Sequence, residues 1–181
     1  MGHNQNIQLT DFESGQARSH MWRYFCARGF VEPTDIVIDF GCGYGYGTYL
    51  LSQVAKKVIG IDKDEAVIKY AMEHYKLPNN YFMASNLDQM ETTPLCDVSI
   101  IVECFEHLRY PESFAHKVME ATRKKIIVTT PIVPTKHEDP THLNDFTESQ
   151  VKEIFTNNKW GNIDSSLQGI YMLAGFVRKH G

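Results

Sequence analysis

Alternating glycines near residue 40 are the first feature of the sequence that suggests chemistry. The apolar run Ile36–Phe40 leads directly into Gly41-Cys42-Gly43-Tyr44-Gly45-Tyr46-Gly47. A strand, a glycine turn and a helix in this order let the backbone approach a nucleotide closely. A dinucleotide site also needs glycine or alanine five residues after the first glycine, and Tyr46 or Thr48 stands there. The pattern that fits is acidic-x-Gly-x-Gly-x-Gly, from Asp39 to Gly45.

An acidic residue follows the next predicted strand. Asp62 ends the run Lys57–Ile61 and lies about 20 positions beyond the glycines, where a carboxylate can accept both hydroxyls of a ribose. The alternative is that Asp62 caps the helix that begins directly after it. Asp64 is better placed for the cap, and we therefore predict that Asp62 serves the ribose.

Two further polar groups follow the strand predicted at 97–102. There the sequence reads Glu103-Cys104-Phe105-Glu106-His107-Leu108. Ligands of open α/β sheets bind beyond the carboxyl ends of the strands, so Glu103 and His107 are candidates to face a cofactor and a substrate. The pKa of histidine lies near neutral pH, which suits a general base. The alternative for His107 is an ordinary surface histidine.

The irregular segment 132–145 is rich in proline and charge, and loops of this length are often functional. It contains His137-Glu138-Asp139 and His142-Leu143-Asn144-Asp145. These groups suggest a metal, but their spacings match no standard zinc pattern, and oxygen-rich magnesium sites are not recognisable by spacing. We predict no metal site. His142 is the second candidate for a general base.

Strand and helix patterns alternate along the chain, which predicts an α/β fold. The predicted helices and strands are, in order, helix 14–27, strand 36–40, a helix from 49, strand 57–61, helix 64–75, strand 81–83, strand 97–102, helix 111–122, strand 124–129, helix 147–157 and two strands within 161–178. Residues 1–12 are expected to be loosely ordered.

Composition limits the class of protein. The chain has 181 residues, which predicts one domain, and 43% of them are hydrophobic. A net charge of −4 gives no general attraction to nucleic acid or anionic membranes. Its 4 cysteines include no CxxC, which favours reduced thiols in a cytoplasmic protein. The first residues lack the features of a secretory signal, and no apolar run is long enough to span a bilayer.

Together these motifs resemble the class I S-adenosylmethionine-dependent methyltransferases over roughly residues 18–150. The shared features are His20-x-x-Arg23-Tyr24-x-x-Ala27, the glycine motif, the Glu-x-x-Glu-His-Leu segment and Thr130-Pro131. The resemblance implies a Rossmann-like, doubly wound, mostly parallel seven-stranded sheet with helices on both faces and a C-terminal antiparallel hairpin. It also implies that S-adenosylmethionine is the cofactor and S-adenosylhomocysteine the product.

The resemblance also implies a set of site residues. Arg23 is expected near the carboxylate of the cofactor, the alternative being a solvent-exposed arginine on a helix. Asn86 stands where the family usually has an aspartate that meets the adenine amino group; its amide oxygen can accept that hydrogen bond, although simple turn chemistry is the alternative. The expected cofactor-binding residues are Arg23, Asp39, Gly41, Gly43, Gly45, Asp62, Asn86, Leu87 and Glu103, and the expected catalytic residues are His107 and His142.

The implied reaction is transfer of a methyl group to an acceptor. Signatures of Asn-Pro-Pro-Tyr type for amino methylation of bases are absent, as is a cysteine placed for pyrimidine chemistry. We therefore expect oxygen methylation of a small molecule or a glycan rather than of a nucleic acid. Two alternatives remain: a non-catalytic S-adenosylmethionine-binding or scaffold protein, and a nicotinamide-dependent oxidoreductase, which the missing third glycine disfavours.

Overall fold

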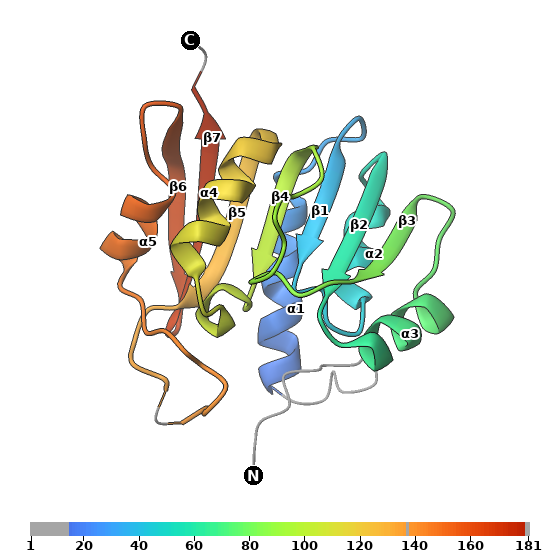
Figure 1. Cartoon of the computed structure of the whole chain (residues 1–181), viewed down its shortest axis with the longest axis horizontal. Helices are drawn as coiled ribbons and strands as arrows, with labels where there is room; N and C mark the ends of the chain where they lie inside the picture. The colour runs from blue at the N-terminus through green and yellow to red at the C-terminus, as the bar shows by residue number, and fades with distance from the viewer. Residues whose placement is uncertain (1–14, 137, 180–181) are drawn as a thin grey trace.

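A computed structural model describes residues 15–136 and 138–179, so the expectation for residues 1–12 lies outside the described residues. The chain forms one seven-stranded sheet in the order β3-β2-β1-β4-β5-β7-β6 (Figure 1). Its strands are β1 Ile36–Phe40, β2 Lys57–Asp62, β3 Asn80–Ala84, β4 Cys96–Val102, β5 Thr122–Pro131, β6 Trp160–Gln168 and β7 Tyr171–Arg178. Its helices are α1 Gly15–Arg28, α2 Tyr46–Ser52, α3 Glu65–His74, the 3-10 helix η2 Phe105–His107, α4 Pro111–Ala121 and α5 Glu148–Ile154.

The sheet has a parallel part and an antiparallel part. Strands β3, β2, β1, β4 and β5 pair in parallel, whereas β7 pairs antiparallel with both β5 and β6. The predicted Rossmann-like sheet with a C-terminal hairpin is therefore confirmed. The main differences are at boundaries: β5 begins two residues before Lys124, and α2 begins at Tyr46 rather than at residue 49.

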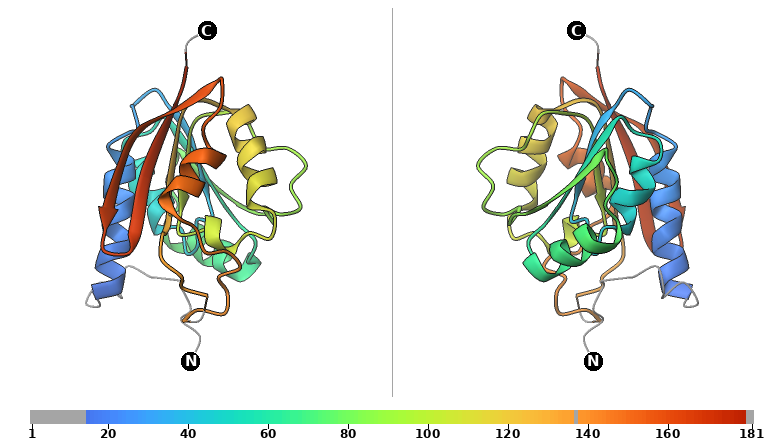
Figure 2. Two further views of the ribbon diagram at one scale, coloured as in Figure 1. Left: turned by 90° about the vertical axis from the view of Figure 1, so that its left-hand side faces the viewer. Right: turned by 90° about the vertical axis from the view of Figure 1, so that its right-hand side faces the viewer.

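Helices cover both faces of the sheet (Figure 2). Helices α1 and α2 lie on one face, α4 and α5 on the other, and α3 lies at the β3 edge. Alternate residues of the central strands therefore enter two different hydrophobic cores: Val98 and Ile100 pack toward α1 and α2, and Ile101 packs toward α4 and α5. Burial on both faces explains why β1 and β4 are nearly continuous apolar runs in the sequence.

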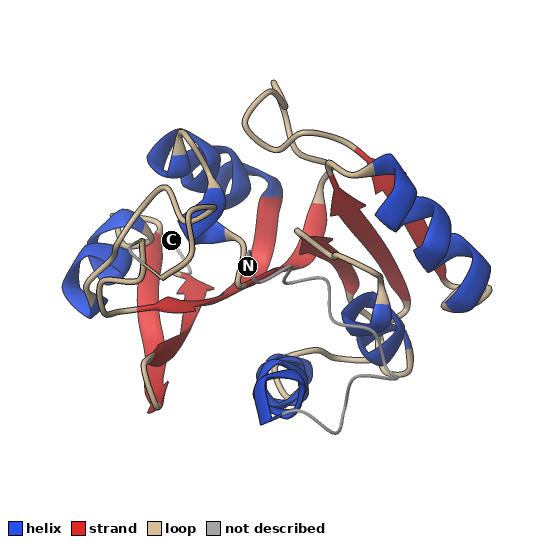
Figure 3. Cartoon of the chain, turned by 90° about the horizontal axis from the view of Figure 1, so that it is seen from below, coloured by secondary structure: helices blue, strands red, loops and turns tan. Residues whose placement is uncertain are grey.

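The carboxyl ends of the parallel strands meet at one edge of the sheet, and Figure 3 looks onto this edge. The glycine turn follows β1, Asp62 ends β2, Glu103 follows β4 and Pro131 ends β5. Polar groups that lie far apart in the sequence are thereby gathered where open α/β sheets bind ligands. Within the described residues, no helix has the length and apolar character needed to cross a membrane.

Candidate functional site

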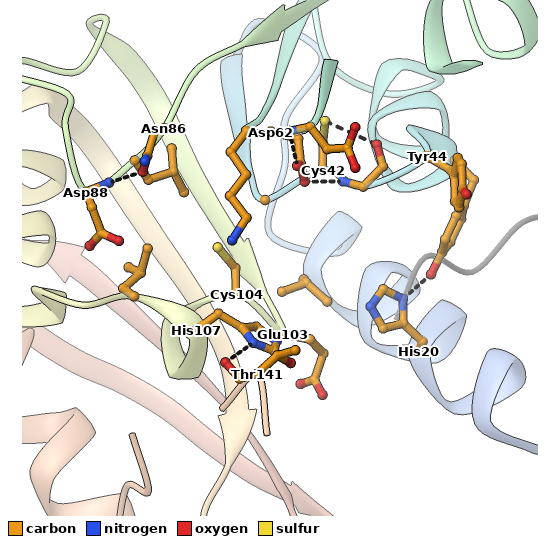
Figure 4. A pocket seen from close by; sticks show the side chains of 18 residues that line it. His20, Cys42, Tyr44, Asp62, Asn86, Asp88, Glu103, Cys104, His107 and Thr141 are labelled. Carbon is orange, nitrogen blue, oxygen red and sulfur yellow. Dashed lines mark hydrogen bonds between the residues drawn. The ribbon is translucent and has the colours of Figure 1, made fainter. Parts of the chain in front are cut away.

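A cavity of about 310 Å³ lies at this edge, and we call it the strand-end cavity (Figure 4). Its volume is at the lower end of the range for small-molecule sites. The walls come from the turn after β1, the end of β2, the loop after β3, the loop after β4, helix α1 and the loop after β5. Each segment contributes polar atoms, which makes the cavity suited to a polar ligand of nucleotide type.

Backbone forms the wall after β1. Gly41 and Gly43 line the cavity with φ angles of 73° and 52°, a region that residues with a side chain rarely adopt. A Cβ atom at Gly41 would lie 2.5 Å from the sulfur of Cys104. Gly45 does not line the cavity; a Cβ atom there would lie 2.5 Å from Cβ of Ala71 in α3. Two glycines thus allow close approach of a ligand, and the third allows close packing of a helix.

Asp39 lies behind the glycine turn and does not line the cavity. Its fully buried carboxylate accepts hydrogen bonds from the hydroxyls of Tyr24, at 3.0 Å, and Thr48, at 2.7 Å. Burial raises the pKa of Asp39 to about 7. This residue joins α1 and α2 beneath the turn, so its effect on a ligand would be exerted through the position of the turn.

Asp62 lies on the wall of the cavity, as the sequence led us to expect. Its two carboxylate oxygens accept from the backbone N–H of Gly43 at 3.0 Å and of Asp64 at 3.1 Å. The carboxylate therefore bridges the glycine turn and the end of β2, and it keeps lone pairs for further donors. The side chain of Asp64 caps α3 by accepting from the N–H groups of Ala66 and Val67, which confirms the predicted cap.

Asn86 and Leu87 line the cavity from the loop after β3. The amide oxygen of Asn86 accepts from the N–H of Asp88 at 3.1 Å, so the turn chemistry considered for Asn86 does occur. Asp88, which no motif in the sequence indicates, accepts from the N–H groups of Arg109 and Tyr110. The loop after β3 is thereby fixed to the loop after β4.

Glu103 has the most unusual backbone of the site. With a φ angle of 49°, it is the one non-glycine residue of the described chain in the left-handed region. Its N–H donates to the carbonyl of Thr129 and its carboxylate accepts from the Thr129 hydroxyl, both at 3.1 Å. Burial raises its pKa to about 7, although Arg23 and the Thr129 hydroxyl act in the opposite direction. Strained backbone of this kind concentrates at ligand sites.

Arg23 lies behind Glu103 rather than on the wall of the cavity. Only 4% of the residue is exposed, so the alternative of a solvent-exposed arginine is wrong. Its Nε lies 3.7 Å from a carboxylate oxygen of Glu103, and its guanidinium lies 3.5 Å from the ring centre of Tyr171. The helix residue that does reach the cavity is His20, whose ring is hydrogen-bonded to the hydroxyl of Tyr46.

The structure brings His107 and His142 together, with ring centres 4.7 Å apart. His107 lines the cavity, whereas His142 lies just outside it and is 7% exposed. Burial lowers the pKa of both imidazoles, which favours their neutral forms. Glu106, the second glutamate of the Glu-x-x-Glu-His-Leu segment, is fully buried beside them. No local spacing pattern relates these three side chains, because His142 comes from a loop more than 30 residues later in the sequence.

Comparison with known proteins gives a consistent answer. Residues 37–125 match the family described as methyltransferase domain. A protein of Invertebrate iridescent virus 6 that carries a methyltransferase name is 30% identical over 125 residues, which are 64% of this chain and 46% of that protein. A protein of Mycolicibacterium smegmatis named as an S-adenosylmethionine-dependent methyltransferase is 34% identical over 101 residues, which are 52% of this chain and 37% of that protein. The chain thus matches less than half of the length of each relative.

Solved structures share the fold. The N-methyltransferase NodS from Bradyrhizobium japonicum, in complex with S-adenosylhomocysteine, superposes with a TM-score of 0.77 over 98% of this chain and 94% of that one. Its sequence is 15% identical, so this likeness concerns the fold alone.

Proposed function

We propose that the chain is a class I S-adenosylmethionine-dependent methyltransferase and that it transfers a methyl group from S-adenosylmethionine to an acceptor bound beside the strand-end cavity. The observation that carries this proposal is the arrangement of the cavity. Glycines without side chains, a strand-end carboxylate and a buried glutamate converge on one space of about 310 Å³. When bound, S-adenosylmethionine supplies an activated methyl group on a positively charged sulfonium.

The described residues fit this cofactor in type and position. Gly41 and Gly43 leave room for it against the backbone, and Asp62 keeps acceptor capacity for the two ribose hydroxyls. Asn86 and Leu87 would meet the adenine, with an amide as the polar contact and an apolar side chain beside it. Glu103 would hold the positively charged end, because a carboxylate in a buried site favours a nearby cation.

The acceptor would bind where His107 opens the cavity toward the loop after β5. Thr141 of that loop lines the cavity, and its carbonyl lies 3.0 Å from Nδ1 of His107. We propose oxygen methylation of a small molecule or a glycan, because a hydroxyl acceptor must lose a proton and two neutral histidines lie on this side. The net charge of −4 supports this choice over a nucleic acid.

Two measurements test the proposal. The first compares thermal unfolding with S-adenosylmethionine, S-adenosylhomocysteine and NAD; we expect stabilisation by the first two alone. The second screens hydroxyl-bearing small molecules and glycans with a labelled methyl donor. Stabilisation by NAD instead would contradict the cofactor assignment. Tight binding of S-adenosylmethionine without transfer to any acceptor would favour the alternative of a non-catalytic binding or scaffold protein.

A further inference from the structure

Three potential metal ligands lie close together next to the part of the strand-end cavity where we propose that the acceptor binds. Glu106, His107 and His142 each offer one ligand atom, and these atoms all lie within 4.8 Å of one another. Two atoms that are each about 2.0–2.2 Å from one ion lie at most about 4.4 Å apart, so the three groups would have to draw slightly closer together to share an ion. The three residues come from two segments, the η2 turn after β4 and the loop after β5.

Glu106 carries the observation that points to a ligand. The residue is 0% exposed, and its Oε2 accepts from the hydroxyl of Thr130 at 3.0 Å. Its Oε1 is buried and, among the described residues, has no hydrogen-bond partner. Buried polar atoms are nearly always partnered, because an unpaired one costs free energy. A cation at the centre of the three ligand groups would supply the missing partner of Oε1.

The imidazole of His107 is already oriented as a metal ligand would be. Its Nδ1 lies 3.0 Å from the carbonyl oxygen of Thr141. A carbonyl oxygen only accepts, so Nδ1 must carry the proton, and Nε2 is then the nitrogen through which His107 would bind a cation. This outer hydrogen bond to a carbonyl is the arrangement that fixes metal-binding histidines in proteins.

His142 is held in a similar way, with Nδ1 2.7 Å from the hydroxyl of Thr135. Its Nε2 lies 3.8 Å from Oδ2 of Asp139, and the other carboxylate oxygen of Asp139, Oδ1, accepts from the N–H and hydroxyl of Thr141. A simple histidine–aspartate contact is therefore the alternative for this residue. That alternative leaves Oε1 of Glu106 unexplained.

The two segments are fixed to each other before any ion binds. The backbone carbonyl of Glu106 accepts from the N–H groups of Leu143, at 2.9 Å, and Asn144, at 3.0 Å. The side-chain amide of Asn144 also donates to the carbonyl of Leu108 at 2.6 Å. The ligand groups are therefore preorganised, which lowers the conformational cost of binding.

We propose that Glu106, His107 and His142 bind one divalent transition-metal ion. Two neutral imidazoles and one carboxylate suit first-row divalent ions such as Mn²⁺, Co²⁺ or Zn²⁺ better than Mg²⁺, which favours oxygen ligands. Three protein ligands leave further coordination positions, as in catalytic metal sites. The spacing rules applied to the sequence could not suggest this set, because they compare residues within one segment.

The role of the ion in methyl transfer rests on the proposed function. The proposal that the three residues bind an ion does not depend on that function. His107 lines the cavity, so open positions on the ion would face a hydroxyl of the acceptor. The ion would withdraw electron density from that oxygen without changing its own oxidation state, and the O–H proton would pass to solvent water. A histidine that binds the ion would then not act as a free base.

The test is metal binding by the tag-free protein after treatment with a chelator. Absorption of bound Co²⁺ and calorimetry with Mn²⁺, Zn²⁺ and Mg²⁺ give stoichiometry and affinity. We expect one site, with Co²⁺ bound more tightly than Mg²⁺, and at least about 10-fold weaker binding in H142A. H116A is the matched control, because His116 lies on α4 with its side chain 69% exposed, and it should bind as the parent does.

Glu106→Gln gives a second readout that does not depend on a damaged fold. Glutamine keeps the shape and removes the charge, so the metal-free variant should unfold at the same temperature as the parent or higher. The stabilisation that Co²⁺ gives the parent should be lost. Absence of a bound ion, or equal affinity in the parent, H142A and E106Q, would overturn the proposal. Binding of S-adenosylhomocysteine by the metal-free protein is measured separately, so failure of the proposed function is distinguishable.

Discussion

The two sides of the strand-end cavity are built on different principles. On the glycine side, from Gly41 to Asp64, backbone groups form the wall and each carboxylate is bonded to N–H groups only a few residues or one strand away. On the glutamate side, Glu103 and Glu106 are buried with raised pKa values, and their partners come from β5 and α1. On the glycine side the carboxylates have hydrogen-bond partners, which suits the binding of a ligand in one fixed position. On the glutamate side an oxygen of Glu106 has no partner among the described residues, which suits the binding of a charged group.

The largest expected effect concerns Asp39, which lies beneath the glycine turn and, like the two glutamates, is buried with a raised pKa. Asp39, beneath the turn, has a folded pKa of about 7 against 3.8 when unfolded. A raised pKa means that folding takes up a proton, so this contribution to stability is present below about pH 4 and is lost as pH rises toward 7. Asparagine cannot ionise, so the free energy of unfolding of Asp39→Asn should not show this fall with pH. The difference amounts to up to about 4 kcal/mol, at about 1.4 kcal/mol for each pKa unit.

Urea unfolding of parent and Asp39→Asn at pH 4.5, 6 and 7.5 measures this difference. Parallel curves of unfolding free energy against pH would show that Asp39 is ionised throughout. The two sides of the cavity would then differ more sharply than we describe.

The next prediction concerns the glycine turn. Gly43→Val places a branched side chain at a φ angle of 52° on the wall of the cavity, and we expect at least about 100-fold weaker binding of S-adenosylhomocysteine. Gly169→Val is the matched control. Gly169 also has positive φ, at 60°, but a Cβ atom there meets no atom within 4 Å. Calorimetry that finds both folded variants equally impaired would attribute the effect to strain rather than to the cavity.

A smaller effect is expected at the end of β2. Asp62→Ala should weaken binding of S-adenosylhomocysteine by about 1.5–3 kcal/mol, the usual contribution of hydrogen bonds to a charged group. Asp164→Ala, on the exposed part of β6, is the control for loss of one negative charge. Unchanged affinity in a folded Asp62→Ala protein, measured by calorimetry, would mean that this carboxylate only fixes the glycine turn.

The smallest effect separates the two neighbouring aspartates. Because Asp64 caps α3, Asp64→Ala should lower the free energy of unfolding by about 1 kcal/mol and leave the affinity for S-adenosylhomocysteine nearly unchanged. Denaturant unfolding and calorimetry on the same variant give both numbers. A loss of affinity as large as that in Asp62→Ala would show that Asp64 serves the ligand as well as the helix.

The contrast between the two sides also explains which parts the sequence could predict. The glycine turn, the end of β2 and the cap at Asp64 depend on residues close in the sequence, and their positions are as expected. The place of Asp39 behind the turn depends on Tyr24 and Thr48, which only packing of α1 and α2 brings to it.

For the glutamate side, the sequence predicts some of the residues but not how they contact one another. Its motif placed Glu103 and His107 correctly at the end of β4. The contact of Arg23 with Tyr171, and the approach of His142 to Glu106, join residues separated by more than 30 positions in the sequence. Helical or strand periodicity contains no information about such pairs, because tertiary packing of separate segments forms them.

The order of the strands has a consequence for how the chain is made. Strand β7 follows β6 in the sequence, yet in the sheet it lies between β5 and β6. Until residues 171–178 have left the ribosome, β5 keeps an open edge and β6 has no neighbour to pair with. Such edges are sites of wrong pairing and aggregation in a nascent chain. Since Tyr171 also packs on Arg23, the glutamate side of the cavity reaches its final form only after this late insertion.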